Sequence, residues 1–402
     1  MAKLPVVALK KGEDKRLRFG HPWAFSNEIQ MEAQTKALPA GSLVSLTDAG
    51  GVRLGIATFN PHSLIAARLL DRDAATVIDR DFIAAKIARA TALRDRLIGA
   101  PYYRLIHAEY RLIHAEADGL PGLIVDRFGD VLALQANTAG VELLTPLIVE
   151  ALEATLKPTA IVARNDSSVR TLEGLQQETS VLRGEVSGPV ALQEYGSTFF
   201  ADLASGQKTG WFYDQRDNRR FAAELAKGAR VLDAYCYAGG FAVQAAKAGA
   251  ISVLALDRSE PALAMAAKAA EANGVAGKVK FQRGEVFAEL EKIETAKEKF
   301  GLVIADPPAF VKSRKDLKSG AQGYRKLARL ASALVESGGF MVIASCSHLV
   351  DPPLFAEQVR RGLADNRRTG RILRSLGAAP DHPVHPALPE TAYLKALFLQ
   401  LD

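Results

Sequence analysis

The sequence has little cysteine and no long apolar run. Its 402 residues include two cysteines, Cys236 and Cys346, too few for a disulfide framework and, by themselves, for a structural zinc site. No apolar run reaches the roughly 20 residues that a membrane-spanning helix needs. The N-terminus also lacks a signal-peptide core before its first charges. We therefore expect a cytoplasmic protein with no membrane partner and no metal site.

Composition is otherwise that of a globular protein. Aromatic residues make up 7%, but 48% of the residues are hydrophobic and 24% are charged. The length exceeds one ordinary hydrophobic core and predicts two or three domains. A net charge of +6 favours a polyanionic partner such as RNA, although proteins that bind no polyanion can carry the same excess.

Residues 1–73 predict a small β-barrel domain. Short β-like runs are separated by glycine, proline and aspartate turns, and they lie at Val6–Leu9, Leu43–Leu46, Leu54–Phe59 and Leu64–Leu70. A basic segment containing Arg18 precedes an aromatic group containing Trp23. Basic side chains can hold phosphates and aromatic rings can stack on bases, so both residues are candidate RNA contacts. The alternative is a solvated turn beside a core tryptophan.

Residues 74–190 predict a central α+β domain. The expected helices are Asp79–Ile98 and Val141–Leu156, and strands are expected on both sides of the turn at 128–130, at 160–163 and within 179–200. The heptapeptide YRLIHAE occurs twice in tandem, at 103–109 and 110–116. Its repeated His107 and His114 could be taken for metal ligands, but the duplication explains their spacing and the sequence offers no evident third ligand.

Residues 191–402 alternate strand and helix, which predicts an α/β domain with a mainly parallel sheet covered on both faces. In such a sheet the ligand binds at the carboxyl ends of the strands. The expected strands are 231–233, 253–257, 279–283, 302–306, 340–345, 372–376 and 395–400. The expected helices are 219–226, 241–248, 261–273, 286–299, 323–335 and 353–364.

A glycine-rich turn follows the first of these strands. In VLDAYCYAGG, at 231–240, the strand ends at Asp233 and the turn leads into a helix. Glycine lets a ligand approach the backbone closely. Asp257 ends the next strand, where a carboxylate can accept hydrogen bonds from ribose hydroxyls. Nicotinamide and S-adenosylmethionine sites both have this pattern, so the turn does not separate them.

The fourth strand ends in Asp306-Pro307-Pro308-Ala309-Phe310. Two prolines fix φ and delay the next helix, which holds the Asp306 carboxylate and the following backbone rigidly over a cofactor. An aromatic ring such as that of Phe310 can stack on a flat substrate. This loop favours methyl transfer to a planar base over hydride transfer. The alternative is a coincidental proline-rich turn.

Cys346 follows the fifth strand, at the same sheet edge. Carbon 5 of a pyrimidine is a poor nucleophile, but a thiolate added to carbon 6 makes carbon 5 enamine-like and able to attack a sulfonium methyl group. The thiolate form of the cysteine is required. The alternative is that Cys346 is a small buried hydrophobic residue, which is the role we expect for Cys236.

Segments along almost the whole chain carry a resemblance to one family. They are RFGHPWAFSNEI, EADGLPGLIVDRFGD, KTGWFYDQRDNR, YCYAGGF, DPPAF, SCSHLV and DHPVHPALPETAYLK. The chain resembles the bacterial cytosine-5 methyltransferases of large-subunit ribosomal RNA. The resemblance implies a PUA domain, a central α+β domain and a class I methyltransferase domain, with 23S ribosomal RNA as substrate and S-adenosylmethionine as cofactor.

The resemblance also implies site residues. Cys346 would be the nucleophile, and Asp306 would orient the cytosine. Cofactor contacts would come from Gln215, Arg216, Asp233, Tyr237, Gly239, Asp257, Glu285 and Asp306, and substrate contacts from Phe310, Lys312, Arg18 and Trp23.

Three departures from the family pattern stand out. Glu285 replaces a frequent aspartate, and Ala309 replaces a second cysteine that assists product release in other branches. The base for product release is therefore unassigned. The pattern also needs one YRLIHAE copy, and we expect the second to take that place while the first extends the preceding element or bulges out.

Other assignments stay open at this point. Basic runs at 312–329 and 360–374 favour RNA, but each could be a solvated helix face. A guanine-nitrogen RNA methyltransferase of the same fold and a non-catalytic RNA-binding scaffold are the alternative functions, and a nicotinamide-dependent oxidoreductase comes third. The RNA could be free or in an assembly intermediate, and a homodimer is one of the open oligomeric states.

Overall fold

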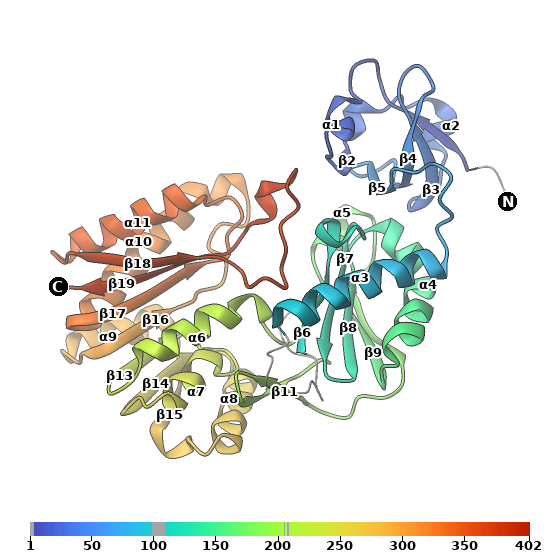
Figure 1. Ribbon diagram of the computed structural model, residues 1–402. Helices are drawn as coiled ribbons and strands as arrows, with labels where there is room; N and C mark the ends of the chain where they lie inside the picture. Colours follow the sequence, from blue (N-terminus) through green and yellow to red (C-terminus); the bar gives the residue numbers. More distant parts are fainter. Residues whose placement is uncertain (1–3, 99–108, 205, 207–208) are drawn as a thin grey trace. The chain divides into compact units, whose positions relative to one another are not determined.

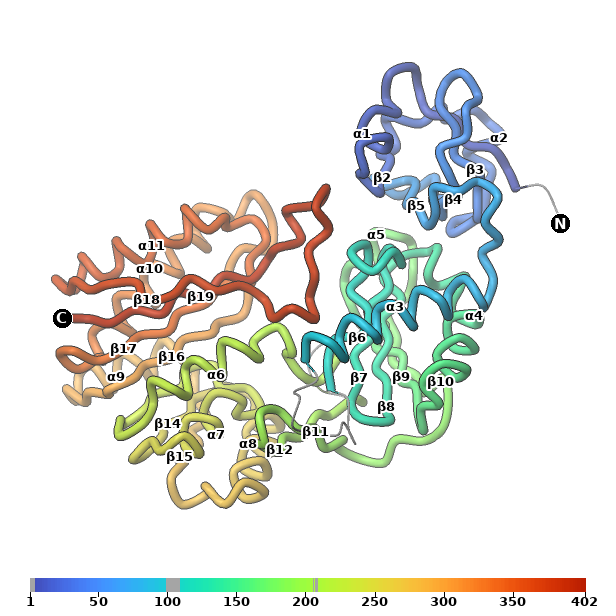
Figure 2. The backbone as a smooth tube through the Cα atoms, viewed as in Figure 1, coloured from blue at the N-terminus to red at the C-terminus, as the bar shows by residue number. Residues whose placement is uncertain are grey.

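The computed structural model describes residues 4–98, 109–204, 206 and 209–402, which form two compact units. The first comprises Met1–Val190, Asp202–Trp211 and Pro380–Pro389, and the second comprises Ala191–Ala201, Phe212–Ala379 and Glu390–Asp402. Figure 2 follows the chain through both. Two segments expected in the domain over 191–402 thus cluster with the first unit. The three-domain division stays a prediction.

The N-terminal part of the first unit is built on a sheet of five described strands in the order β1-β3-β4-β5-β2. These are β1 (Val6–Ala8), β2 (Trp23–Ala24), β3 (Ser42–Thr47), β4 (Arg53–Phe59) and β5 (Ala67–Asp71). The single-turn helices α1 (Lys15–Arg18) and α2 (Ala33–Lys36) lie between them, too short to produce a helical period in the sequence. Buried Leu9, Val44 and Phe59 fill the core.

The central part has a second sheet, whose described strands run in the order β10-β9-β8-β7-β6. They are β6 (Glu109–His114), β7 (Leu123–Phe128), β8 (Val131–Ala136), β9 (Ala160–Asn165) and β10 (Glu178–Arg183), with helices α3 (Arg80–Ile98), α4 (Ala139–Leu156) and α5 (Val169–Leu172). Residues of the second YRLIHAE copy form most of β6 and pair with β7. The first copy, apart from Glu109, lies outside the described residues.

Residues 380–389 belong to the first unit through buried polar contacts of Asp381. The Asp381 carboxylate accepts a hydrogen bond from the Arg111 backbone N–H at 3.0 Å, and its carbonyl accepts one from the Arg94 guanidinium at 2.9 Å. Arg94 is fully buried and also forms a bidentate ion pair with Asp118. A segment late in the sequence therefore completes the polar core of an early one.

The second unit contains a sheet of seven described strands in the order β15-β14-β13-β16-β17-β19-β18. The strands are β13 (Arg230–Ala234), β14 (Ser252–Asp257), β15 (Val279–Arg283), β16 (Phe300–Ala305), β17 (Val335–Ser345), β18 (Gly370–Leu376) and β19 (Lys395–Leu401). The first five are parallel to one another, whereas β19 runs antiparallel between β17 and β18. A hairpin of β11 (Val190–Glu194) and β12 (Ser197–Ala201) precedes this sheet.

Helices cover both faces of the seven-stranded sheet (Figure 1). They are α6 (Arg216–Leu225), α7 (Gly240–Lys247), α8 (Glu260–Ala272), α9 (Val286–Thr295), α10 (Leu317–Leu334) and α11 (Pro352–Asp365). The first three gather on one face and the last three on the other. Helix α9 ends four residues before its predicted end because the chain turns there through Lys297, at a left-handed φ of 58°. None of the helices in the described ranges is long and apolar enough to cross a membrane.

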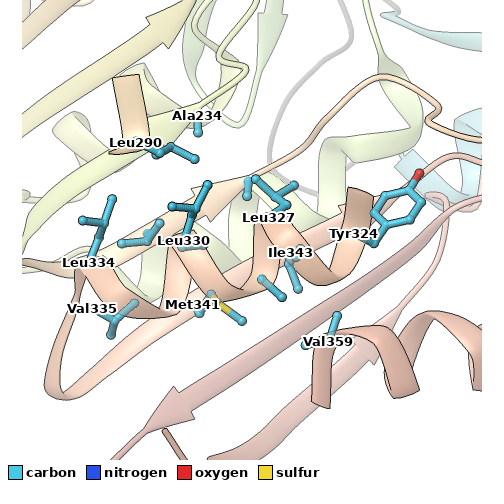
Figure 3. Packing of buried hydrophobic residues seen from close by; sticks show 14 of the residues in the cluster. Ala234, Leu290, Tyr324, Leu327, Leu330, Leu334, Val335, Met341, Ile343 and Val359 are labelled. Carbon is cyan, nitrogen blue, oxygen red and sulfur yellow. The ribbon is translucent and has the colours of Figure 1, made fainter. Parts of the chain in front are cut away.

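Helix α10 supplies the centre of the core in the second unit. Its Leu327, Leu330 and Leu334 recur at helical spacing and pack toward the sheet, as Figure 3 shows. Met341 of β17 and Val359 of α11 belong to the same buried cluster. This row of leucines fixes the position of α10 against the sheet.

Close packing of α11 on α10 gives a first prediction. A Cβ at Gly362 would lie 2.5 Å from the Arg325 carbonyl oxygen and 2.6 Å from the Ala328 Cβ. Gly-to-Ala changes inside helices ordinarily stabilise, by up to about 1 kcal/mol. Here overpacking dominates, and Gly362→Ala should lower the free energy of unfolding by about 1–3 kcal/mol in urea denaturation.

The matched control is Gly277→Ala, since a Cβ there meets no described atom within 4 Å. This variant should unfold at the wild-type urea concentration. Equal stability of the two variants would contradict the tight contact between α10 and α11.

Candidate active site

Parallel strands bring the predicted polar residues to one sheet edge. β13 lies between β14 and β16, and β17 follows β16. Asp233 and Asp257 lie at or near the carboxyl ends of their strands, while Asp306 and Cys346 follow β16 and β17 directly. Backbone hydrogen bonds tie these ends together, from Asp306 N–H to the Ala234 carbonyl at 3.3 Å and from Cys236 N–H to the Leu256 carbonyl at 2.9 Å.

The turn after β13 has an unusual backbone. Tyr235, Tyr237 and Gly239 adopt left-handed φ angles of 68°, 47° and 80°. Such angles are uncommon and unfavourable for tyrosine, and they persist where surrounding contacts hold them. The Tyr237 N–H donates to the Asp257 carboxylate at 2.9 Å. At Gly239 a Cβ would also lie 2.9 Å from the Ala266 Cβ. The glycines located this turn in the sequence, but nothing indicated the two strained tyrosines.

Asp233 is a fully buried carboxylate. Neither of its oxygens makes a hydrogen bond to a side chain of the described residues. Burial raises its pKa to about 8, the charges of Asp306 and Asp257 add to this effect, and the Ala242 backbone N–H opposes it. A buried acid without side-chain donors is costly to keep charged. The site therefore favours a cationic or hydrogen-bond-donating ligand beside Asp233.

The Asp257 carboxylate accepts hydrogen bonds from two backbone N–H groups. One carboxylate oxygen accepts from Tyr237 N–H, and the other accepts from Ser259 N–H at 2.8 Å. Each oxygen retains a second lone pair for a ligand hydroxyl. Glu285 is exposed at the N-cap of α9. Its negative charge contributes, after burial, to a raised pKa of Tyr235, which places Glu285 near the turn.

Gln215 and Arg216 lie in a buried polar region at the start of α6. The Gln215 side-chain oxygen accepts from the Asn218 amide at 2.6 Å. Nearby, Arg219 makes two 2.6 Å hydrogen bonds to Glu194. This pair fixes α6 onto β11, and it was missed in the sequence because its partners lie 25 residues apart in different elements. The cofactor role of Gln215 and Arg216 stays a prediction.

The half-buried Cys346 lies in a loop that three elements hold in place. The side-chain oxygen of Ser347 accepts from the Val311 N–H at 3.2 Å and contacts the Tyr324 hydroxyl at 2.8 Å. The Ser347 carbonyl accepts from the Lys395 ammonium at 2.7 Å. The loop after Cys346 is thereby tied to the segment following Asp306, to α10 and to β19.

The predicted substrate residues occupy different settings. The Phe310 ring packs 4.7 Å from that of Tyr324 and 5.9 Å from that of Phe287, measured between centroids, so it adjoins the core. Lys312 is exposed. Stacking of Phe310 on a base and the contact of Lys312 with RNA stay predictions.

Arg18 and Trp23 lie in the first unit. Arg18 forms ion pairs with Asp14 and Asp48, and the Trp23 indole N–H donates to Glu116 at 2.9 Å. Contact of either residue with RNA also stays a prediction.

His114 is a packing residue. Its ring centroid lies 5.1 Å from that of His382, and burial together with the Arg111 charge lowers its pKa to about 2. His107 lies outside the described residues. Over the described ranges, no group of three His, Cys, Asp or Glu side chains is placed to hold a metal ion.

Comparisons with known proteins agree with this architecture. A family model described as S-adenosylmethionine-dependent methyltransferase matches residues 164–400, and a PUA-like domain model matches residues 7–72. Proteins named ribosomal RNA large subunit methyltransferase I are 38% identical, over 397 residues in Aeromonas hydrophila (98% of both chains) and 392 residues in Photobacterium profundum (97% of both).

Two solved structures share the fold at low identity. An S-adenosylmethionine-dependent methyltransferase from Streptococcus mutans has a TM-score of 0.81, and a methyltransferase complexed with SAH has a TM-score of 0.83. Each is 19% identical and covers 99% of this chain and 100% of its own. The predicted α/β fold with a PUA-like domain is confirmed.

The buried charge of Asp233 gives a second prediction. Its folded-state pKa of about 8 exceeds the unfolded value of about 4. Between these values the folded state binds a proton that the unfolded state lacks, so stability falls as pH rises from about 4 to 8. Asp233→Asn should remove this loss, and its stability advantage over the wild type in urea denaturation should grow toward pH 8.

The same variant should bind S-adenosylmethionine at least about tenfold more weakly in calorimetry at pH 8, because it lacks the carboxylate that would compensate a cation. Glu260→Gln removes an exposed carboxylate and serves as the control for both measurements. An Asp233→Asn variant that follows the wild-type pH profile of stability would count against a buried charge at this position.

Proposed function

Because the chain belongs to the S-adenosylmethionine-dependent methyltransferase family, we propose that it methylates carbon 5 of a cytosine in the ribosomal RNA of the large subunit. It is an enzyme, and its cofactor is S-adenosylmethionine. Relatives matched over nearly their full length bear the name ribosomal RNA large subunit methyltransferase I. The observation that carries the choice of carbon 5 is Cys346, at the strand end adjacent to the Asp306 loop.

The residues around the turn suit this cofactor. Asp233 is a buried carboxylate without a described side-chain donor, and Asp257 and Asp306 are close enough for their charges to raise its pKa. These carboxylates can compensate a cationic ligand and accept from its hydroxyls. Gly239 allows the left-handed turn to form against Ala266, where a Cβ would not fit. When bound, S-adenosylmethionine supplies an electrophilic methyl group on a sulfonium.

Cys346 provides covalent catalysis in this proposal. Its thiolate bonds to carbon 6 of the cytosine, and the electron pair of the 5,6 double bond moves to carbon 5, which becomes the nucleophile for the methyl group. A base then takes the carbon 5 proton, the electron pair of that C–H bond restores the 5,6 double bond, and the bond between sulfur and carbon 6 breaks to return the thiolate. In the same proposal, Asp306 holds the polar edge of the base and keeps carbon 6 near the sulfur.

The substrate is the 23S ribosomal RNA, free or in an assembly intermediate, and the reaction takes place in the cytoplasm, where ribosomes are assembled. The basic run at 312–329 begins beside the Asp306 loop, and exposed Lys312 opens it. Further along, Arg325, Lys326 and Arg329 pair with carboxylates of the second unit. Their positive charge is thus partly neutralised, so the start of the run is the better candidate for phosphate contacts.

The nucleophile assignment gives a third prediction. Cys346→Ala should abolish 5-methylcytosine formation, since carbon 5 is then no longer activated. Cys236→Ala is the matched control and should keep activity within a few-fold, because Cys236 is buried in the turn. The measurement is mass spectrometry of nucleosides from large-subunit RNA incubated with enzyme and S-adenosylmethionine. Full methylation by Cys346→Ala would instead favour a guanine-nitrogen methyltransferase.

A further inference from the structure

Lys395 is a nearly buried lysine beside the Cys346 loop. It is 6% exposed, opens β19 and pairs in register with Ser345, the last residue of β17. Its ammonium donates to the Ser347 carbonyl and to the Tyr393 carbonyl, both at 2.7 Å. The ammonium therefore lies against the backbone of the residue that follows Cys346.

The partners of this ammonium are unusual for a buried cation. Both hydrogen-bond acceptors described for it are neutral backbone carbonyls, whereas buried charges are ordinarily paired with an opposite charge. The negative groups that act on Lys395 are Cys346, in its thiolate form, and Asp351 at the N-cap of α11. Asp351 already accepts from the Leu354 N–H, which caps that helix. Asp351 is also exposed to solvent, whereas Cys346 is half-buried and immediately precedes Ser347, the residue whose carbonyl binds the ammonium.

The other polar groups of this region do not replace Lys395. The Tyr324 hydroxyl contacts Ser347, and burial raises its pKa, so it stays a neutral phenol. The His348 ring packs against that of Tyr393 at 5.2 Å. Asp306, which follows the neighbouring strand, carries the same sign as a thiolate and would disfavour it. Lys395 is a cation hydrogen-bonded directly to this loop.

Charge interactions between Lys395 and Cys346 are reciprocal. Burial lowers the pKa of Lys395 to about 8, and the negative charges of Cys346 and Asp351 oppose that shift. A thiolate that stabilises the ammonium form of the lysine is itself stabilised by that ammonium. A Cys346 thiolate and the Lys395 ammonium would therefore stabilise each other.

We propose that Lys395 is a positioning residue that holds Cys346 as the thiolate and fixes the loop that presents it. The inference rests on the proposed function, in which Cys346 attacks carbon 6. As the S–H bond breaks, the proton passes to the neutral amine and an N–H bond forms, giving an ammonium–thiolate pair without any redox change. The ammonium stays in place while sulfur is bonded to carbon 6 and stabilises the thiolate again when that bond breaks.

The test measures the thiol directly, without RNA or cofactor. The full chain is treated with iodoacetamide between pH 5 and 10, and alkylation of the Cys346 peptide is followed by mass spectrometry. Wild-type Cys346 should react with a midpoint below the ordinary thiol value of about 8.5. Cys236 is an internal reference, because burial raises the pKa of its thiol. A wild-type midpoint at or above about 8.5 would overturn the proposal.

Variants separate a charge effect from a structural one. Lys395→Met should raise the midpoint by one pH unit or more and lower alkylation and methylation at pH 7 by about tenfold, with methylation regained at pH 9. Lys395→Arg should keep the midpoint near the wild-type value. Lys299→Met, which removes an exposed lysine bonded to the Ala333 carbonyl, is the control and should change neither.

The outcomes distinguish the role of Lys395 from the cytosine-5 mechanism itself. A folded Lys395→Met protein with an unchanged midpoint, or with a methylation loss that is equal at every pH, would refute the role of Lys395. If that variant does not fold, the wild-type and Lys395→Arg midpoints decide instead. A low wild-type midpoint together with an active Cys346→Ala enzyme would leave the ion pair intact and reject the cytosine-5 mechanism.

Discussion

The parallel register of β13, β14, β16 and β17 is the constraint on which the site depends. It places four chemically active strand ends at one edge, so residues far apart in the sequence become neighbours. The arrangement has an electrostatic cost, because Asp233 is buried near two further carboxylates. A cationic ligand would relieve that cost on binding.

The hydrophobic core and the nucleophile are mechanically connected. The leucine row of α10 fixes that helix on the sheet, and Tyr324 of the same helix reaches Ser347 beside Cys346. Lys395 holds the other side of the loop from β19. The cysteine is thus positioned by regular elements on two sides, which limits its movement more than a free loop would.

Sequence patterns located most elements and the strand ends, because buried parallel strands and glycine turns leave strong local signals. Features that depend on distant pairing could not be found in this way. Lys395 is brought to Cys346 by the insertion of β19 between β17 and β18, which no local pattern encodes. Likewise, the left-handed Tyr237 is held by its hydrogen bond to Asp257, which is distant in the sequence. Helix α9 ends at Thr295, and the chain then turns at Lys297, which is not one of the residues that usually mark a helix end.

The contacts of Asp381 affect when the first unit can finish folding during synthesis. The buried contacts of Asp381 with Arg94 and Arg111 belong to the first unit, although it lies 287 and 270 residues beyond them in the sequence. During synthesis from the N-terminus, the first unit therefore waits for nearly the last segment of the chain before its polar core is complete. Until then, the Arg111 backbone N–H and the Arg94 guanidinium lack the acceptors that Asp381 supplies. A C-terminal truncation before residue 380 would therefore disturb both units rather than one.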